Sequence, residues 1–221
     1  MLHIHHHLGL GDHIICNGLV REFAKSNHPI GLFCKHHNLS TVSYMYRDLQ
    51  NLKLIGVNDD KDTLNVDAPC LRIGFIISQM ICQAYRITWD QSFYAQCSLD
   101  SSKRWTSFYF QRDSYRENSV FLTLNPTKER YALIHSLGSD GADRLNHSAV
   151  DPTLKAIHIQ KGLTDNLLDY AMLIENATEI HCIDSSFKHL CDSFRLTAKA
   201  FYHNVPARGE QHQQQNNWIL V

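Results

Sequence analysis

The chain of 221 residues is 43% hydrophobic and 19% charged, with a formal net charge of −1 when histidine is neutral. This composition is typical of a globular protein long enough to bury a core, and the balanced charge excludes a broad basic surface for nucleic acid. Seven scattered cysteines without a CxxC pair favour reduced thiols, and hence the cytoplasm, over a disulfide framework. No apolar run reaches the roughly 20 residues of a transmembrane helix, and no signal peptide is expected.

The N-terminal segment reads LHIHHHLGLGDHIICNGLVREFAK over residues 2–25. A run rich in apolar residues and histidine, followed by two glycines, predicts a strand that enters a tight loop at Gly9 and Gly11. The spacing of the apolar residues from 14 to 23 predicts a helix with Asp12 as its N-cap. The segment is therefore expected to form a strand, a glycine-rich turn and a helix.

Strands and helices continue to alternate through the first half of the chain. Strands are expected over 29–35 and 52–57, a helix over 39–50, a polar loop over 58–69, helices within 73–97, and a connector with a helical piece over 102–126. This βαβαβ order predicts a parallel sheet. The most apolar stretch, 70–82, is short and contains Arg72, so we expect it to be a buried segment.

A second α/β unit is expected after a boundary near Asn125 and Pro126. Strands are expected over 131–136, 155–160, 179–184, 198–204 and 218–221, helices over 167–177 and 185–196, and loops over 137–146 and 209–217. The prediction is an α/β protein with two Rossmann-like domains, 1–125 and 126–221, that face a cleft. In such sheets the ligand lies beyond the carboxyl ends of the strands.

The turn GLGDHI, which begins at Gly9, is the first candidate site. Glycines let the backbone approach a ligand, and a helix N-terminus attracts anions. The dinucleotide fingerprint GxGxxG is incomplete because position 14 is isoleucine, and no P-loop lysine is present. Asp12 and His13 are candidate general bases. In the alternative interpretation, Asp12 only caps the helix and the turn binds nothing.

Two further loops have residues suited to a phosphate. In DSSFKHL, Asp184 ends a strand and Ser185 and Ser186 open a helix, where hydroxyls and free N–H groups can bind an anion. Helix capping alone is the alternative. In HSLGSDGADRLN, Arg144 can hold a phosphate with two nitrogens, unless it is a solvated surface arginine.

The N-terminal histidines permit a metal-site hypothesis. In a strand, His3, His5 and His7 would share one face and His6 would lie on the other. Neighbours along one strand rarely converge on a single ion without an outside ligand, and the remaining histidines and cysteines lack zinc-finger spacing. A metal site is therefore disfavoured.

Two stretches together resemble a known family. GLGDHIICNGLVRE resembles the opening of GT-B glycosyltransferases of the heptosyltransferase kind, and LLDYAMLIENATEIHCIDSSFKHLCD resembles their second domain. DSSFKHL is also similar to a turn of the GT-B fucosyltransferases. The resemblance implies a compact enzyme with a nucleotide-sugar donor bound mainly by the second domain. It further implies an acceptor hydroxyl of a glycan, lipid or other molecule at the first domain, and no metal or other cofactor.

The resemblance also suggests roles for individual residues. Asp12 or His13 would be the base. The donor-phosphate set comprises Gly9, Gly11, Asp184, Ser185, Ser186 and His189, to which we add Arg144 from its charge and position. Three alternatives stay open: a non-catalytic nucleotide or sugar-phosphate binding protein, another Rossmann-type enzyme such as an epimerase or dehydrogenase, and a metal-binding module built on the N-terminal histidines.

Overall fold

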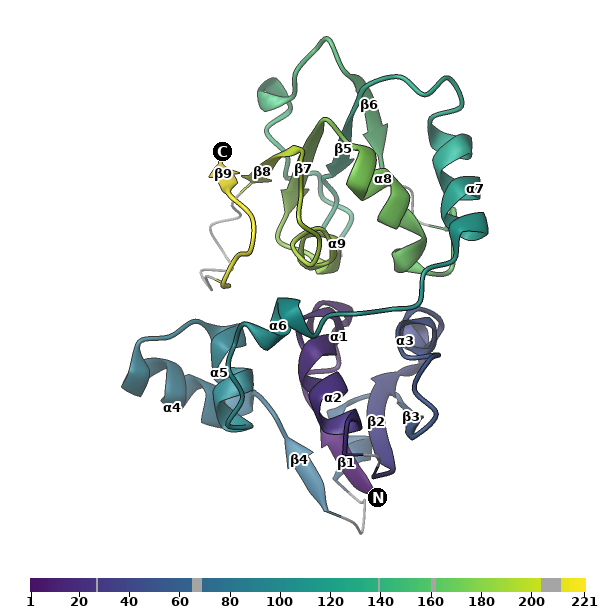
Figure 1. The fold of residues 1–221 in the computed structure, drawn as a ribbon. Helices are drawn as coiled ribbons and strands as arrows, with labels where there is room; N and C mark the ends of the chain where they lie inside the picture. The colour runs from purple at the N-terminus through teal and green to yellow at the C-terminus, as the bar shows by residue number, and fades with distance from the viewer. Residues whose placement is uncertain (27, 65–68, 139, 160–161, 204–211) are drawn as a thin grey trace. The chain divides into compact units, whose positions relative to one another are not determined.

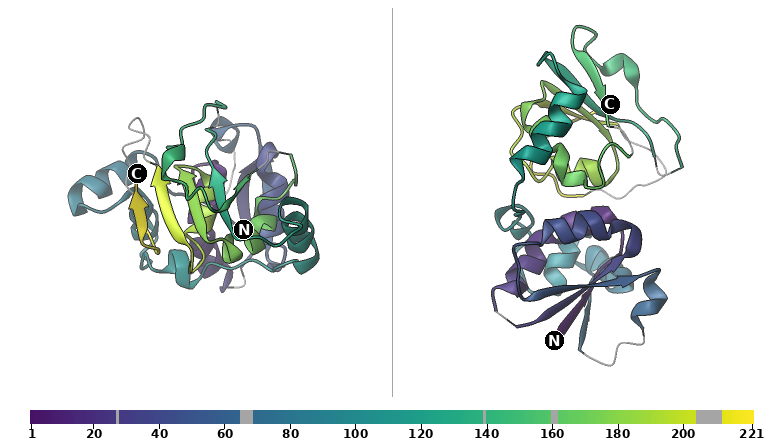
Figure 2. Two further views of the ribbon diagram at one scale, coloured as in Figure 1. Left: turned by 90° about the horizontal axis from the view of Figure 1, so that it is seen from above. Right: turned by 90° about the vertical axis from the view of Figure 1, so that its right-hand side faces the viewer.

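The computed structural model describes residues 1–26, 28–64, 69–138, 140–159, 162–203 and 212–221. The chain divides into two compact α/β units. One unit comprises Met1–Gln111 with Glu210–Gln213, and the other comprises Arg112–Gly209 with Gln214–Val221. Figures 1 and 2 show a sheet with helices packed along it in each unit. No helix within the described residues has the length and apolar character needed to cross a membrane.

The first unit contains a parallel sheet in the order β3-β2-β1-β4. Its strands are β1 (Leu2–His5), β2 (Ile30–Lys35), β3 (Leu52–Val57) and β4 (Cys70–Arg72). In the register of the sheet, Ile4 lies opposite Leu32 on one side and Leu71 on the other. Ile4 and Leu32 are completely buried. β2 is buried over Ile30–Cys34 and is nearly continuously apolar, as expected for a strand covered on both faces.

The helices of the first unit differ in detail from the expectation. They are α1 (Leu10–Ile15), α2 (Asn17–Ala24), α3 (Leu39–Met45), α4 (Phe75–Tyr85), α5 (Trp89–Gln96) and α6 (Lys103–Thr106), with short 3-10 helices η1 (His36–Asn38) and η2 (Asp60–Thr63). The helix expected after the glycine turn is two helices, because Cys16 leaves helical geometry at φ −83°, ψ 1°. The most apolar segment was expected to be buried, and this is wrong for α4, in which Ser78 is the one buried residue.

The second unit contains a five-stranded parallel sheet in the order β6-β5-β7-β8-β9. Its strands are β5 (Tyr131–His135), β6 (Lys155–His158), β7 (Glu179–Ile183), β8 (Lys199–His203) and β9 (Trp218–Leu220). Its helices are α7 (Ser114–Leu124), α8 (Ala171–Asn176) and α9 (Ser186–Cys191), with 3-10 helices η3 (His147–Ala149) and η4 (Leu167–Tyr170). β9 closes the sheet as expected, through pairing of Phe201 with Ile219.

The division between the units falls after Gln111, earlier than the expected boundary between 125 and 126. Helix α7 and the residues just before it belong to the second unit, where their arginines form ion pairs. The Arg116 guanidinium lies 2.8 Å from the Asp169 carboxylate, and Arg112 lies 2.9 Å from Glu175. Part of the expected loop 209–217 lies outside the described residues. The described Gln213 donates its backbone N–H to Asp90 Oδ1 at 3.0 Å in the first unit.

Candidate functional site

The strand order of each sheet indicates where a ligand would bind. In the first unit, β2 and β3 lie on one side of β1 and β4 lies on the other. In the second unit, β6 lies on one side of β5, whereas β7, β8 and β9 lie on the other. Open parallel sheets bind ligands beyond the carboxyl ends of the strands where such a reversal occurs. The loops that follow β1, β4, β5 and β7 are therefore the candidate site segments.

The loop after β1 ends at Gly9, whereas Gly11 and Asp12 lie in the first turn of α1, so the expectation that the loop extends through Gly11 is wrong. Gly9 is the N-cap of α1, with φ −70° and ψ 147°, so the expected N-cap role of Asp12 is wrong. The helix begins earlier than expected, which places Asp12 in its first turn. There the helix dipole favours a negative charge. The Asp12 carboxylate folds back over the loop, since a Cβ on Gly9 would come within 2.7 Å of Asp12 Oδ2. Asp12 is partly exposed.

His13 lies in a different environment from Asp12. Its side chain is completely buried, and neither ring nitrogen has a hydrogen-bond partner. Its ring packs edge-on against His6 with centroids 4.4 Å apart. Burial lowers the pKa of His6 to about 4 and holds the pKa of His13 well below its usual value. Both rings are therefore neutral near pH 7, and His13 has no exposed surface for an acceptor.

The remaining N-terminal histidines each have a separate environment. His5 Nδ1 accepts from the Arg72 guanidinium at 2.8 Å, and its Nε2–H donates to Asp60 at 2.9 Å. Because arginine only donates, this fixes the tautomer. Burial lowers the pKa of His5. His3 packs on Phe33 with ring centroids 5.8 Å apart. In the described part of the chain, the N-terminal histidines belong to no group of three ligands suited to one metal ion.

The loop after β4 completes this edge of the first sheet. Gly74 has φ 100° and Phe75 has φ 58°, a left-handed conformation that is costly for a side chain with a Cβ. The Phe75 N–H donates to His7 Nε2 at 3.0 Å, and the two rings lie 4.4 Å apart. A Cβ on Gly74 would come within 2.6 Å of the His7 ring. This loop was not among the expected sites, although it repeats the strand–glycine–helix pattern seen at Gly9.

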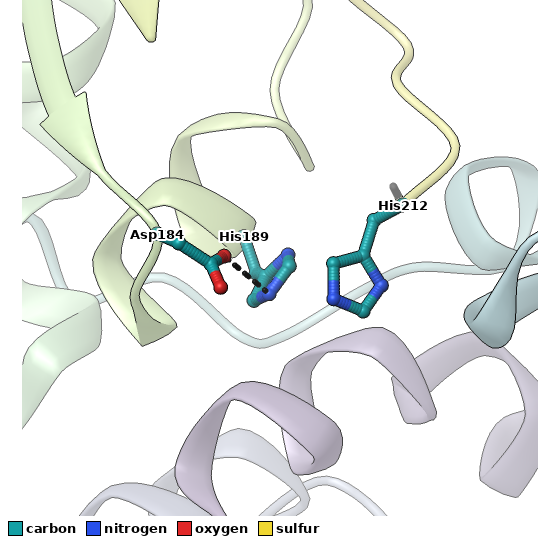
Figure 3. A group of neighbouring side chains, drawn as sticks. All are labelled: Asp184, His189 and His212. Atoms are coloured by element: carbon teal, nitrogen blue, oxygen red, sulfur yellow. Dashed lines mark ion pairs between the residues drawn. The ribbon is translucent and has the colours of Figure 1, made fainter. Parts of the chain in front are cut away.

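The loop after β7 and helix α9 contain the DSSFKHL motif, of which Figure 3 draws Asp184 and His189. Ser185 is the N-cap of α9 and accepts from the Lys188 N–H at 3.2 Å, so the capping interpretation holds for its hydroxyl. Asp184 Oδ1 lies 3.9 Å from His189 Nε2. Asp184, Ser185 and Ser186 are partly exposed, whereas His189 is buried. His212, also drawn in Figure 3, belongs to the first unit, where its Nδ1 lies 3.7 Å from Asp90.

The loop after β5 contains Arg144. Its guanidinium forms a two-pronged ion pair with Asp140 of the same loop, and its backbone N–H donates to the carbonyl of Ser136 at 3.0 Å. Hydrogen bonding to Arg144 holds the pKa of Asp140 below its usual value. Arg144 is therefore not a freely solvated arginine. A phosphate would have to replace Asp140 at the guanidinium.

A row of buried, hydrogen-bonded side chains, which the sequence pattern did not indicate, anchors the end of the loop that contains Arg144. The Asn146 N–H donates to His203 Nδ1 at 3.1 Å, which leaves the proton of His203 on Nε2. This Nε2 lies 3.1 Å from His181 Nδ1, and His181 Nε2 lies 3.2 Å from Glu179. Burial lowers the pKa of His203 to about 4. This row fixes the loop of Arg144 to the carboxyl end of β8, next to β7.

Comparison with solved structures identifies a related fold. The chain is similar over its whole length to the crystal structure of a glycosyl transferase of family 9 from Veillonella parvula DSM 2008, and it covers 86% of that chain. The TM-score is 0.59 and the sequence identity is 11%. The chain therefore has a glycosyltransferase fold of the GT-B-like kind. No protein-family model and no curated protein matches the sequence.

Proposed function

We propose that this protein is a glycosyltransferase that moves a sugar from a nucleotide-sugar donor to an acceptor hydroxyl without a bound metal ion. The observation that carries the proposal is the likeness of the whole chain to a family 9 glycosyl transferase. The positions of the candidate residues support it. Asp12 follows β1 and Ser185 follows β7, and each of these strands ends where the strand order of its sheet reverses.

Asp12 is the proposed general base. The acceptor oxygen attacks the anomeric carbon, its proton passes to the Asp12 carboxylate, and the bond from the anomeric carbon to the phosphate oxygen breaks. The nucleoside diphosphate leaves with the electron pair of that bond. Asp12 suits this role better than His13 because its side chain is partly exposed, whereas His13 is completely buried. Gly9 at the end of this loop and Gly11 in the first turn of α1 would let the backbone approach a substrate.

The second unit is proposed to hold the donor. Ser186 and the N–H groups at the start of α9 would donate to the diphosphate, and Asp184 and His189 would shape the same turn. Arg144 would join them by exchanging Asp140 for the phosphate. These donors would neutralise the leaving group in place of a metal ion.

A thermal-shift panel of UDP, GDP, ADP, CMP and NAD tests the proposal. A ligand present at 100 times its Kd adds about 2.7 kcal/mol to stability, which is readily detected. We expect a shift with one nucleoside diphosphate. The nucleotide sugar of that diphosphate is then used in a turnover assay with wild type and Asp12→Asn. The control is Asp100→Asn, an exposed carboxylate of the same unit.

We expect Asp12→Asn to bind the donor and lose turnover, and Asp100→Asn to retain both. Binding without turnover in the wild type would support the non-catalytic alternative. A shift with NAD alone would support an epimerase or dehydrogenase.

A further inference from the structure

Three buried polar side chains lie in a row on one face of the second sheet. Below, "the histidine row" denotes Glu179 and His181 of β7 together with His203 of β8, all of which are buried. Strands β7 and β8 are neighbours in the sheet (Figure 1). The His181 ring also stacks on Phe201, with ring centroids 4.4 Å apart. Polar groups are stable at such a position only when they are hydrogen-bonded, so the bonds of the row determine its properties.

The two ends of the histidine row fix the position of each ring proton. The Asn146 backbone N–H can only donate, so His203 Nδ1 accepts from it at 3.1 Å and carries no proton. The Glu179 carboxylate can only accept, so His181 Nε2 donates to it at 3.2 Å. In neutral rings the remaining bond then runs from the His203 Nε2–H to His181 Nδ1, at 3.1 Å. Each ring therefore donates once and accepts once.

A further proton on either ring would break the hydrogen bond from Asn146. On His203 it would occupy Nδ1 and face the Asn146 N–H. On His181 it would occupy Nδ1, so His203 would have to accept it through Nε2 and carry its own proton on Nδ1, again facing Asn146. Burial lowers the pKa of both rings, that of His203 to about 4, so the row is neutral near pH 7.

The charged groups around the histidine row act on its protonation in two directions. Within the described residues, His147 of η3 also faces His203, and a positive charge on His147 lowers the pKa of His203. His147 Nε2 lies 2.9 Å from the Asp143 carboxylate. Glu179 acts in the opposite direction, because it favours a proton on His181, but burial has the larger effect there. The row therefore resists protonation in the folded unit.

The hydrogen bond from Asn146 lies close to Arg144 in the chain. The Arg144 N–H donates to the Ser136 carbonyl at 3.0 Å, and Leu145 packs against a buried cluster that contains Ile134. Neither of these attachments depends on pH. The bond from Asn146 to His203 does, because it requires an unprotonated Nδ1. The position of the Arg144 segment is therefore coupled to the protonation of the histidine row.

We propose that the histidine row holds Arg144 in the position that binds the donor phosphate, and that it does so only while both histidines are neutral. His203 is then a positioning residue, because it acts on the donor through Asn146 and Arg144. This inference rests on the proposed role of Arg144 in donor binding. The hydrogen bond itself can be tested without a donor.

Hydrogen exchange of the Asn146 amide, measured by NMR at pH 7.5 and pH 5, tests the hydrogen bond. Asn146 is exposed, so its amide exchanges once the bond to His203 opens. The pKa of His203 is about 4 with the bond closed and should approach about 6.5 with it open. Protection, corrected for the intrinsic exchange rate, should therefore fall by up to about 30-fold from pH 7.5 to pH 5. The amides of β5 report global unfolding and should stay more protected at both pH values.

Two substitutions of His203 separate its role as an acceptor from its titration. In His203→Asn, the side-chain oxygen can accept from the Asn146 N–H near the position of Nδ1 but does not titrate. Protection should remain, without the 30-fold fall in acid. In His203→Leu the acceptor is lost, and protection should be lost at both pH values. His158→Asn, which changes an exposed histidine of β6, is the matched control and should behave as wild type.

Titration calorimetry at pH 7.5 with UDP, GDP and ADP, each used separately, tests the effect on Arg144. His203→Leu should weaken binding of the diphosphate that the wild type binds, by at most the roughly tenfold expected for Arg144→Ala. His203→Asn should bind it as tightly as the wild type. In the Arg144→Ala background, His203→Leu should have no further effect, because both changes act through the same guanidinium.

Unfolding midpoints establish that each variant is folded, and His203→Asn alone decides the pH dependence if His203→Leu does not fold. Equal pH dependence of Asn146 protection in the wild type and His203→Asn would overturn the proposal. Additive losses of affinity in the Arg144→Ala, His203→Leu double variant would overturn the positioning role. Absence of binding of all three nucleotides by the wild type would instead contradict the proposed function, while the exchange data would still decide whether the histidine row controls the Asn146 hydrogen bond.

Discussion

Replacing His13 by phenylalanine separates the two residues that the sequence offers as a general base. The His13 ring is completely buried, both of its nitrogens lack hydrogen-bond partners, and His6 packs against it. Phenylalanine keeps the shape of the ring and removes the unpartnered nitrogens. A buried polar group without a partner costs about 1–3 kcal/mol. We therefore expect His13→Phe to raise the free energy of unfolding by about 1–2 kcal/mol at pH 7.

The stability that His13→Phe gains over the wild type should be larger at acidic pH. An unfolded histidine has a pKa of about 6.5, whereas burial lowers the pKa of His6 to about 4 in the folded protein. Between these values the unfolded chain binds more protons, so the free energy of unfolding falls as the pH falls from 6.5 to 4. For one such histidine, proton uptake by the unfolded chain lowers the free energy of unfolding by about 2 kcal/mol between pH 7 and pH 5. The pKa of His13 shifts in the same direction, so His13→Phe should lose less stability over this interval than the wild type.

Urea unfolding at pH 7 and pH 5, monitored by tryptophan fluorescence, gives the free energy of unfolding of each protein at each pH. A turnover assay with the identified donor gives the activity. We expect His13→Phe to be active and Asp12→Asn to be inactive. A destabilised His13→Phe variant with the acid sensitivity of the wild type would refute the burial argument. A folded His13→Phe variant without turnover would instead make His13 the base.

Further substitutions at three places test the packing and the donor site. Arg144→Ala should weaken nucleoside diphosphate binding roughly tenfold, through loss of charged hydrogen bonds. Asp140→Asn should strengthen the same binding, because it frees the Arg144 guanidinium. Titration calorimetry measures the affinity of each variant for the nucleoside diphosphate. Gly18→Ala should cost about 1–3 kcal/mol, because its Cβ would lie 2.0 Å from a backbone carbonyl oxygen of α6, and an unchanged urea midpoint would contradict this close approach. Arg104→Met should lower the free energy of unfolding by about 3–5 kcal/mol, because it leaves the Asp90 carboxylate buried without the Arg104 guanidinium. Adding Asp90→Leu should restore much of this free energy in the same unfolding assay.

All the observed strands except β4 could be predicted from the sequence, because they are short runs rich in apolar residues flanked by polar or glycine-rich turns. β4 was missed because its three residues, Cys70–Arg72, are too few to show a pattern. Helix boundaries were harder to predict than strands. The apolar periodicity around Cys16 continues through a break in the backbone, which hydrophobic spacing does not detect. Burial of His13 was also hidden, since a histidine in a helix is usually counted as polar. Helix α4 misled the prediction most clearly, because a segment rich in isoleucine is expected inside, and its attachment through Ser78 depends on the hydroxyl and amide groups of α5.

Only part of the candidate site could be predicted from the sequence, because the rest depends on the order of the strands in the sheet. Gly9 and Ser185 each come within a few residues of the end of a strand, so local pattern is enough to place each beyond a strand end. Pairing of β4 with β1 is a contact between segments distant in sequence, and it brings the loop of Phe75 beside the loop of Gly9. No local propensity specifies that neighbour, because strand order is decided by which apolar faces pack together. The strained Phe75 backbone therefore becomes a candidate site feature only once the sheet is assembled.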